Sequence, residues 1–259
     1  MSIFQPHRRA WLTGALSSAA GLTLAGCDRL TSEPRVNTAL EVGEIITRRA
    51  QRSLVGRTAL AREYPETAIS ADFRANGTTN PENEAYQQHL AGGFEDWRLE
   101  IGGLVERPLS LSLAELRAAP SRTQITRHDC VEGWSSIGKW RGARLGPLLD
   151  RAGLKPEARF IAFFCADTLE LTFDGSGDYY ETIDVVDAFH PQTLLAYEMN
   201  DGPLPVAHGA PVRLRLERQL GYKMAKYVMR VEAIDSFAAL GRGKGGYWED
   251  RGYQWYAGI

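Results

Sequence analysis

A single cysteine, Cys130, lies among ionisable and aromatic residues in the stretch Arg127-His128-Asp129-Cys130-Val131-Glu132-Gly133-Trp134. A thiolate is a soft ligand, and it therefore suits a soft, redox-active metal. We expect Arg127 and His128 to lower the pKa of this thiol, and Glu132 to relay protons to an oxygen atom on the metal. A buried structural cysteine is the alternative, but it leaves the charged neighbours unexplained.

A second group of polar residues follows in a loop shaped by glycine and proline. Its basic members are His208, Arg213, Lys223 and Lys226. Basic side chains that converge from one segment bind phosphates and polar heterocycles through charge-assisted hydrogen bonds. The same residues also suit a solvated strand face, because apolar residues and arginines alternate along Val212–Leu216. The spacing alone leaves both interpretations open.

Short strands and short helices are expected to position these groups. Alternating or continuous apolar runs predict strands at Trp97–Ile101, Leu104–Val105, Gln124–Arg127, Arg159–Ala166, Leu169–Phe173, Thr193–Glu198, Val206–Glu217 and Tyr227–Ile234. A capping box and a closing proline predict a helix at Ser112–Ala119, and a following glycine predicts one at Leu145–Ala152. Short helices are also expected at Asp184–Phe189 and, within the polar segment after the signal, at Leu40–Arg52. The segment Asp72–Glu95 is poor in apolar residues and is expected to be mostly loop. The predicted class is α+β, with mixed β-sheets and short helices.

The amino-terminal residues indicate export. Arg8-Arg9 precede the stretch Trp11–Gly26, which carries no charge and is shorter than the roughly 20 residues of a spanning helix. This pattern favours a twin-arginine signal, which serves proteins that fold before transport. A general secretory signal that happens to contain two arginines is the alternative. The net charge of −2 does not favour nucleic acid as a partner.

The signal ends in Leu24-Ala25-Gly26-Cys27, which resembles the bacterial lipobox. In that interpretation Cys27 becomes the acylated first residue of the mature protein, and its acyl chains hold the protein on a membrane surface outside the cytoplasm, in the periplasm or an equivalent space. An ordinary small-residue cleavage site with an incidental cysteine is the alternative. The polar residues that follow predict a tether.

Three stretches together resemble the molybdopterin-binding domain of sulfite-oxidase-like enzymes. They are Cys130-Val131-Glu132-Gly133-Trp134, Phe189–Ala196 and His208–Leu214. Within that superfamily the periplasmic protein-methionine-sulfoxide reductase catalytic subunits are the most similar. The resemblance covers residues 69–237, which divides the chain into a signal peptide (1–26), a tether (27–68), the oxidoreductase domain (69–237) and a C-terminal tail (238–259).

The resemblance also implies roles for individual residues. Cys130 matches the molybdenum ligand of the family, and Glu132 matches an acid near the metal. Arg213 and Lys226 match cofactor-binding positions. The segment around Arg74 and Asn76 is loosely similar to one that contacts the pterin.

Two positions depart from the pattern of the reductases. Cys165 stands where they have a cofactor-binding threonine, and His208 stands where they have an asparagine. Both side chains can still make polar contacts to the cofactor.

The cofactor implied by the resemblance is a mononuclear molybdenum-molybdopterin, held by a pterin dithiolene and one protein thiolate. The implied reaction is oxygen-atom transfer on a small sulfur or nitrogen compound, or on a methionine-sulfoxide-like substrate. Sulfite oxidases usually follow the ligand cysteine with Ala-Gly-Asn, so Val131-Glu132-Gly133 favours a reductase. The sequence has no cysteine pattern for an iron–sulfur cluster or an attached haem. Electrons are therefore expected to come from a separate partner, such as a membrane haem protein or a quinone-linked donor.

Two other hypotheses stay open from the sequence. One is a lipid-anchored binding or scaffold protein that keeps the fold without the metal. The other is thiol–disulfide chemistry between Cys130 and Cys165, since an exported protein meets an oxidising compartment.

Replacing the lipobox cysteine tests the expected anchor. The Cys27→Ser variant has no thiol to acylate, so it should move from the membrane fraction to the soluble fraction. Immunoblotting of fractionated cells measures the partitioning. Unchanged membrane association would argue for the ordinary cleavage site.

Overall fold

The computed structural model describes residues 34–173, 175 and 177–259. Contacts divide the chain into two compact units, with the boundary after Leu54. The described part of the first unit, residues 34–54, is all but the last residue of helix α2 (Pro34–Val55). This helix is longer at both ends than the predicted helix Leu40–Arg52. The predicted signal peptide and Cys27 lie outside the described residues. None of the described helices is both long enough and apolar enough to cross a membrane.

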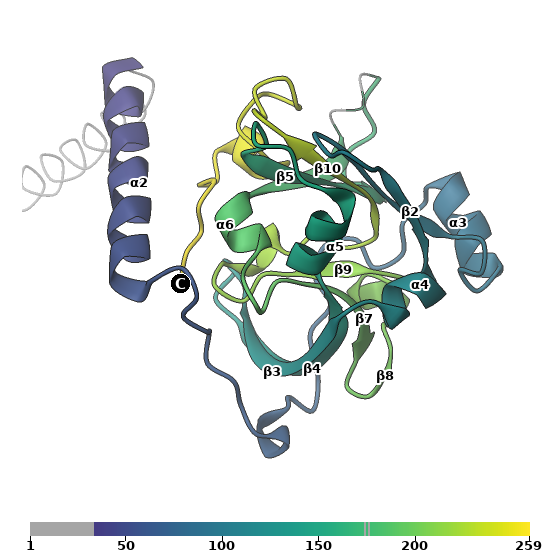
Figure 1. Cartoon of the computed structure of the whole chain (residues 1–259). Coiled ribbons are helices and arrows are strands. Elements are labelled where there is room, and N and C mark those ends of the chain that lie inside the picture. Colours follow the sequence, from purple (N-terminus) through teal and green to yellow (C-terminus); the bar gives the residue numbers. More distant parts are fainter. Residues whose placement is uncertain (1–33, 174, 176) are drawn as a thin grey trace, which may run out of the picture. The chain divides into compact units, whose positions relative to one another are not determined.

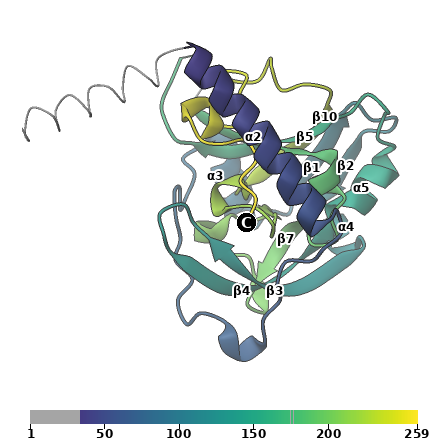
Figure 2. The ribbon, with the colours of Figure 1, turned by 90° about the vertical axis from the view of Figure 1, so that its left-hand side faces the viewer.

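The second unit, Val55–Ile259, is built on two sheets. Its strands are β1 (Arg98–Gly103), β2 (Leu109–Ser112), β3 (Ser121–Asp129), β4 (Ser135–Arg144), β5 (Phe160–Thr168), β6 (Asp178–Asp184), β7 (Leu194–Met199), β8 (Gly202–Pro203), β9 (Arg213–Arg215) and β10 (Val228–Ile234). One sheet has the order β2-β1-β10-β5-β6, in which β1 and β10 are parallel. The other has the order β3-β4-β7-β8, with β9 paired to β7. In both views the long β3–β4 pair lies on the opposite side of the unit from β5 and β10 (Figure 1, Figure 2).

One apolar core joins the two sheets. In β1, Leu99 and Ile101 are buried in this core, whereas Arg98 and Glu100 are exposed. Burying each aliphatic side chain contributes about 1.5–3 kcal/mol, so this alternation fixes which face of the strand turns inward. Residues of both sheets contribute to the core, and the α+β class is confirmed.

Short helices connect the strands at the positions that local signals predict. Helix α4 (Leu113–Ala118) begins with a capping box, in which the Ser112 hydroxyl accepts from the Glu115 N–H at 3.2 Å and the Glu115 carboxylate accepts from the Ser112 N–H at 2.8 Å. Helix α5 (Leu145–Ala152) ends at Gly153, whose φ of 72° lies in the left-handed region. Helix α5 contacts both β1 and β4, and α6 (Val185–Ala188) contacts β5 and β6 (Figure 1).

Four expectations differ from the structure. Leu104–Val105 does not form a strand, because Val105 makes only an isolated bridge to Leu154. The predicted strand Leu169–Phe173 is wrong, because strand pairing ends at Thr168 opposite Asp178 and the exposed residues beyond form a loop. The predicted loop Asp72–Glu95 contains helix α3 (Glu84–Ala91), which Asn83 caps by accepting from the Tyr86 N–H. This helix was missed because Tyr86 is its one buried residue.

The predicted strand Val206–Glu217 is also shorter than expected. It begins as a 3₁₀ turn over Val206–His208, which ends at Gly209 with a φ of 112°. Only Arg213–Arg215 pair with β7. The left-handed glycine turns the backbone out of extended geometry and separates the two parts.

The compact unit extends beyond residues 69–237 at both ends. Before that range, the Gln192 amide accepts from the N–H of Ala61 at 2.8 Å, and Glu63 bridges to Thr126 on β3. After it, Tyr247 and Glu249 are buried. Residues from both flanking segments are therefore packed into the same unit as the sheets.

A buried charge cluster joins the C-terminal segment to this unit. The Lys223 ammonium lies 2.5 Å from a carboxylate oxygen of Glu181 on β6 and 2.5 Å from one of Glu249, and all three side chains are at most 1% exposed. Burial, followed by the charge of Glu249, raises the pKa of Glu181 well above its usual value. The ammonium is therefore needed to stabilise two carboxyl groups that water does not reach.

Removing this ammonium should destabilise the protein strongly. Lys223→Met leaves two buried carboxyl groups without a cation, which should lower the free energy of unfolding by about 3 kcal/mol or more. Lys139→Met is the matched control, because Lys139 also lies between two acids, Glu66 and Asp201, but those acids are exposed to solvent. The control should lose at most about 1 kcal/mol. Urea unfolding measures both, and equal losses would contradict the role of burial.

Candidate cofactor site

Cys130 lies in the turn that connects β3 to β4. Its carbonyl accepts from the Gly133 N–H at 3.0 Å, and its own N–H donates to the Trp134 carbonyl at 3.0 Å. Gly133 has a φ of 86°, a conformation that a side chain would strain. The hairpin thus holds the thiol at the edge of a pocket of about 860 Å³, a volume that includes space open to solvent.

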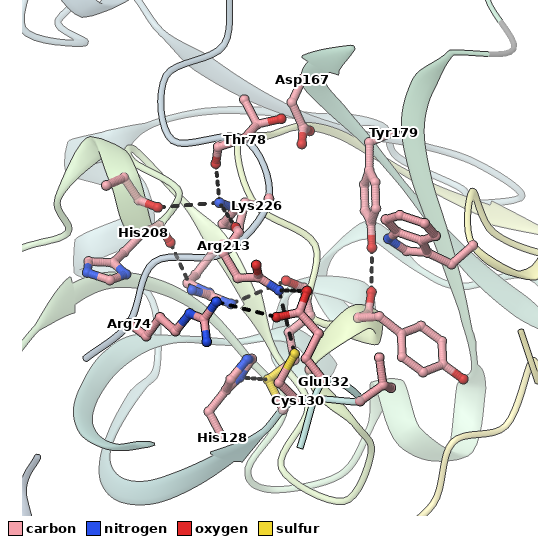
Figure 3. A pocket seen from close by; sticks show the side chains of 18 of the residues that line it. Arg74, Thr78, His128, Cys130, Glu132, Asp167, Tyr179, His208, Arg213 and Lys226 are labelled. Carbon is pink, nitrogen blue, oxygen red and sulfur yellow. Dashed lines mark hydrogen bonds and ion pairs between the residues drawn. The ribbon is translucent and has the colours of Figure 1, made fainter. Parts of the chain in front are cut away.

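Most of the residues expected from the sequence meet in this pocket. They come from four separate stretches of the chain and are Arg74, Asn76, Cys130, Glu132, His208, Arg213 and Lys226. Figure 3 shows Arg74, Cys130 and Glu132 on one side of the pocket and Lys226, Thr78 and Asp167 farther along it.

Glu132 is a hydrogen-bond acceptor in this arrangement. Its carboxylate accepts from the Trp134 indole N–H at 3.0 Å and from the Asn76 amide at 3.3 Å, and it lies 3.9 Å from the Arg74 guanidinium. The bonds from Trp134 and Asn76 lower the pKa of Glu132 below its usual value. The carboxylate form is therefore favoured, and the proton relay expected of Glu132 stays a prediction.

The other side of the pocket is cationic. Arg213 is 4% exposed and donates to the carbonyls of His208 at 2.9 Å and Met224 at 3.4 Å. Its buried Nε has no hydrogen-bond partner among the described residues. Burial and the neighbouring Arg215 lower the pKa of Arg213.

Lys226 adds to this positive region, and the His208 imidazole borders it. The Lys226 ammonium donates to the carbonyls of Asn76 at 2.8 Å, Ala207 at 3.3 Å and Thr78. Burial and the charge of Arg213 lower the pKa of Lys226 to about 8. Burial, followed by Arg213 and Lys226, lowers the pKa of His208 to about 4. These shifts express the cost of gathering cations away from water, a cost that a bound anion would offset.

The arginines of the segment Val212–Leu216 are buried and do not form a strand face exposed to solvent. Arg215 is fully buried, is paired with Glu217 at 2.7 Å and packs over the Trp140 ring at 4.2 Å. Its guanidinium also lies 3.2 Å from Nδ1 of His128, and because arginine can only donate, this nitrogen is the acceptor. Arg213 and Arg215 therefore belong to the interior, where Arg213 faces the pocket.

The comparisons with known proteins agree with this geometry. The family model for the oxidoreductase molybdopterin binding domain matches residues 87–239. A protein from Azospira oryzae with the name "Putative protein-methionine-sulfoxide reductase subunit YedZ1" is 36% identical over 98% of this chain and 88% of its own length. The protein-methionine-sulfoxide reductase catalytic subunit MsrP of Xanthomonas axonopodis pv. citri is 30% identical over 90% of this chain and 71% of its own length.

The chain belongs to the molybdopterin-binding oxidoreductase family. A solved structure, the sulfane dehydrogenase SoxCD from Paracoccus pantotrophus, is similar with a TM-score of 0.48 and 25% identity, over 55% of this chain and 39% of that one.

The residues present fit the molybdenum-molybdopterin cofactor of this family. The cofactor carries a phosphate, and the pocket offers the cations Arg213 and Lys226 with the His208 imidazole beside them; Nε of Arg213 has no hydrogen-bond partner among the described residues. It also carries a metal that accepts thiolate, and Cys130 lies at the edge of the same pocket. The fit to the phosphate rests on Nε of Arg213, which is buried and has no hydrogen-bond partner among the described residues. A buried donor without an acceptor is costly, and a phosphate oxygen would supply the acceptor.

Two residues expected to bind the cofactor of this molybdopterin oxidoreductase do not line the pocket. The Lys223 ammonium instead donates to the carboxylates of Glu181 and Glu249 in the buried cluster. Cys165 lies on β5, where burial and the charge of Asp167 raise its pKa well above the usual value. Cys130 and Cys165 are both free thiols. A buried thiol with a raised pKa is a poor nucleophile, so the thiol–disulfide hypothesis loses support.

Several pocket residues were not expected from the sequence. Asp167 is 4% exposed, and its Oδ1 has no partner among the described residues. The signal that could have found it is an acid at the end of the apolar run Phe160–Ala166. Trp248 and Tyr253 also line the pocket, and they were missed because they follow residue 237.

Gly221 allows another unexpected contact. A Cβ at this position would lie 2.4 Å from Nε2 of His128, so only glycine lets this turn approach the histidine. The turn that carries Tyr222 and Met224 into the pocket therefore packs directly on β3.

The pH dependence of stability should reveal Asp167. Burial raises its pKa from 3.8 to about 6, so the folded state holds this proton more tightly than the unfolded state does. Its contribution to stability is therefore fully present below about pH 4 and lost as pH rises through 6. The change amounts to about 3 kcal/mol in cofactor-free protein.

The Asp167→Asn variant isolates this effect, because the amide does not titrate in this range. The difference in unfolding free energy between variant and wild type should favour the variant increasingly from pH 4 to 7. The variant must be compared with the wild type at each pH, because His208 also titrates. The pKa of His208 is lowered, so its contribution to stability increases with pH over the same range. A difference that stays constant with pH would contradict the raised pKa of the buried carboxyl group.

Proposed function

We propose that this oxidoreductase reduces sulfoxides, with methionine-sulfoxide-like compounds as its substrates. The observation that carries the proposal is Cys130 at the edge of a cation-lined pocket in a chain whose relatives are named protein-methionine-sulfoxide reductases. Val131-Glu132-Gly133 after the cysteine, in place of the Ala-Gly-Asn of sulfite oxidases, supports the reductive direction.

The cofactor, when bound, supplies two-electron oxygen-atom chemistry. The chain itself supplies the thiolate of Cys130 to the metal and the cations Arg213 and Lys226 to the anionic end of the cofactor. In the overall reaction a sulfoxide takes up two electrons and two protons and gives a thioether and water. The aromatic residues Trp134, Trp248 and Tyr253 at the pocket suit a thioether, since sulfur packs favourably against aromatic rings.

The electrons come from a separate partner in this proposal. The sequence has three cysteines, and no pattern among them matches an iron–sulfur cluster or an attached haem. A membrane haem protein or a quinone-linked donor suits a protein held at the same membrane surface.

Export by the twin-arginine route and anchoring through an acylated Cys27 complete the proposal. Arg8-Arg9 and Leu24-Ala25-Gly26-Cys27 support it, and fractionation of the Cys27→Ser variant tests the anchor.

A scaffold that keeps the fold without the metal is less consistent with the pocket. A protein that binds no ligand gains nothing from burying Nε of Arg213 and Oδ1 of Asp167, which find no hydrogen-bond partner in the described part of the chain. Each of these groups lowers the stability of the ligand-free protein, which favours a bound partner for them.

Replacing the ligand cysteine tests the proposed function. Cys130→Ser should abolish sulfoxide reduction by an artificial electron donor, because a hydroxyl is a harder and far less acidic ligand than a thiol. Much of the pterin should stay bound through Arg213 and Lys226, and the Mo(V) paramagnetic resonance signal should change.

Cys165→Ser is the matched control, because Cys165 lies outside the pocket lining. Its sulfoxide reductase activity should stay close to that of the wild type. Equal loss in both serine variants, together with a disulfide in the wild type, would replace the metal-ligand assignment with thiol redox chemistry. Wild-type protein that contains the cofactor but reduces no sulfoxide would reject the substrate class alone.

A further inference from the structure

The side-chain amide of Asn76 touches both the ligand cysteine and its acidic neighbour. Its Nδ2 lies 3.5 Å from the Cys130 sulfur and 3.3 Å from Oε1 of Glu132. Thiolate and carboxylate are both acceptors, so only the NH₂ group of the amide, which has two donor hydrogens, can satisfy them together. The carbonyl end of the amide would be repelled by both, and this chemistry fixes the orientation of Asn76.

We propose that Glu132 and Asn76 form a positioning pair, in which Glu132 holds the Asn76 amide so that it donates a hydrogen bond to the Cys130 sulfur. This inference rests on the proposed ligation of the metal by Cys130. In this inference Glu132 acts by holding Asn76 and not by transferring protons.

Glu132 is well placed to hold a neighbour because its two oxygens are bound by different donors. Oε2 accepts from the indole N–H of Trp134 at 3.0 Å, which leaves Oε1 facing Asn76. Arg74 lies near the same carboxylate at 3.9 Å and over the Trp134 ring at 5.4 Å. The carboxylate is therefore held from its own turn while it binds the segment that carries Arg74 and Asn76 (Figure 3).

The backbone of that segment is fixed from the other side of the pocket. Lys226 donates to the carbonyls of Asn76 and Thr78, and the Tyr227 hydroxyl donates to the Thr78 carbonyl at 2.8 Å. Gly77 lies between them with a φ of 63°, which a side chain would strain. With its backbone held by Lys226 and its side chain by Glu132, Asn76 has little freedom to leave the sulfur.

A hydrogen bond to a ligand sulfur changes the metal that the sulfur binds. The N–H draws negative charge on the sulfur toward itself, so the thiolate donates less charge to the metal and the reduced metal is favoured. Removing the donor should therefore lower the reduction potential. Removing the negative charge of Glu132 alone should act in the opposite direction, because a nearby anion disfavours reduction.

These opposite signs allow a sharp experiment on the cofactor-loaded protein. Glu132→Gln and Glu132→Ala remove the same charge, but glutamine keeps one acceptor oxygen for Asn76 and alanine keeps none. We expect the alanine variant to have the lower Mo(VI/V) potential of the two, measured by redox titration of the Mo(V) paramagnetic resonance signal without substrate. Asn76→Leu, which is close in size but has no donor, should also lower the potential relative to the wild type.

The decisive comparison repeats the two Glu132 substitutions in the Asn76→Leu background. If Glu132 acts through Asn76, the difference between glutamine and alanine should vanish there. A difference of the same size in both backgrounds would overturn the proposal, as would an Asn76→Leu potential equal to that of the wild type. Asn76→Ala replaces Asn76→Leu if the leucine variant does not fold.

Controls separate this proposal from the proposed function. Asn80→Leu removes a nearby side-chain amide, whose oxygen accepts a hydrogen bond from Gln87. Glu198→Ala removes an acid on β7 that is paired with Arg141 on β4. Neither Asn80 nor Glu198 lines the pocket. Both should leave the potential unchanged. The titration needs no sulfoxide, so a wrong substrate class would leave its result intact. A Mo(V) signal that Cys130→Ser does not alter would reject the ligation and this inference with it.

Discussion

The cofactor site depends on two buried arginines, Arg213 and Arg215. Arg213 and Arg215 are two residues apart on β9, and both guanidinium groups lie over the ring of Trp140, at 5.1 and 4.2 Å. Arg215 is paired with Glu217, whereas Arg213 lines the pocket and its Nε has no hydrogen-bond partner within residues 34–173, 175 and 177–259. Burying a cation away from water is costly, so an anionic group in the pocket would stabilise Arg213. The phosphate of molybdopterin has the required charge and the required acceptor oxygens.

The rest of the unit places a thiol opposite that charge. Cys130 comes from the β3–β4 turn of one sheet, and Lys226 precedes β10 of the other. The apolar core that joins the sheets therefore sets the separation between the metal ligand and the anion-binding residues. The buried cluster of Lys223, Glu181 and Glu249 adds the C-terminal segment, which brings Trp248 and Tyr253 to the same pocket.

Much of the scaffold was predictable because its signals are local. The alternation in β1, the capping box at Ser112 and the glycine after α5 each depend on a few neighbouring residues, and each was confirmed. Leu169–Phe173 has the same kind of alternation but no strand to pair with, so it forms a loop. Pairing between strands is a long-range property that a local pattern does not contain.

Site residues could be predicted where they lie in a recognisable motif. Charge alone did not show which basic side chains would reach the pocket. Cys130 and Arg213 lie in recognisable motifs and reach the pocket. Lys223 and Lys226 are three residues apart and look equivalent in the sequence, yet one ammonium enters a buried acidic cluster and the other borders the pocket. The difference comes from Glu249, far along the chain. Asp167 was missed for a similar reason, because its burial depends on how β5 packs and not on its neighbours in sequence.

We propose Cys130 as the protein ligand of the molybdenum cofactor. X-ray absorption at the molybdenum edge of the purified wild-type protein tests it most directly, since it counts the sulfur atoms bound to the metal. We expect three sulfur ligands, two from the pterin and one from Cys130, with one fewer in Cys130→Ser. Equal sulfur counts in the two proteins, or wild-type protein that contains no molybdenum, would contradict it.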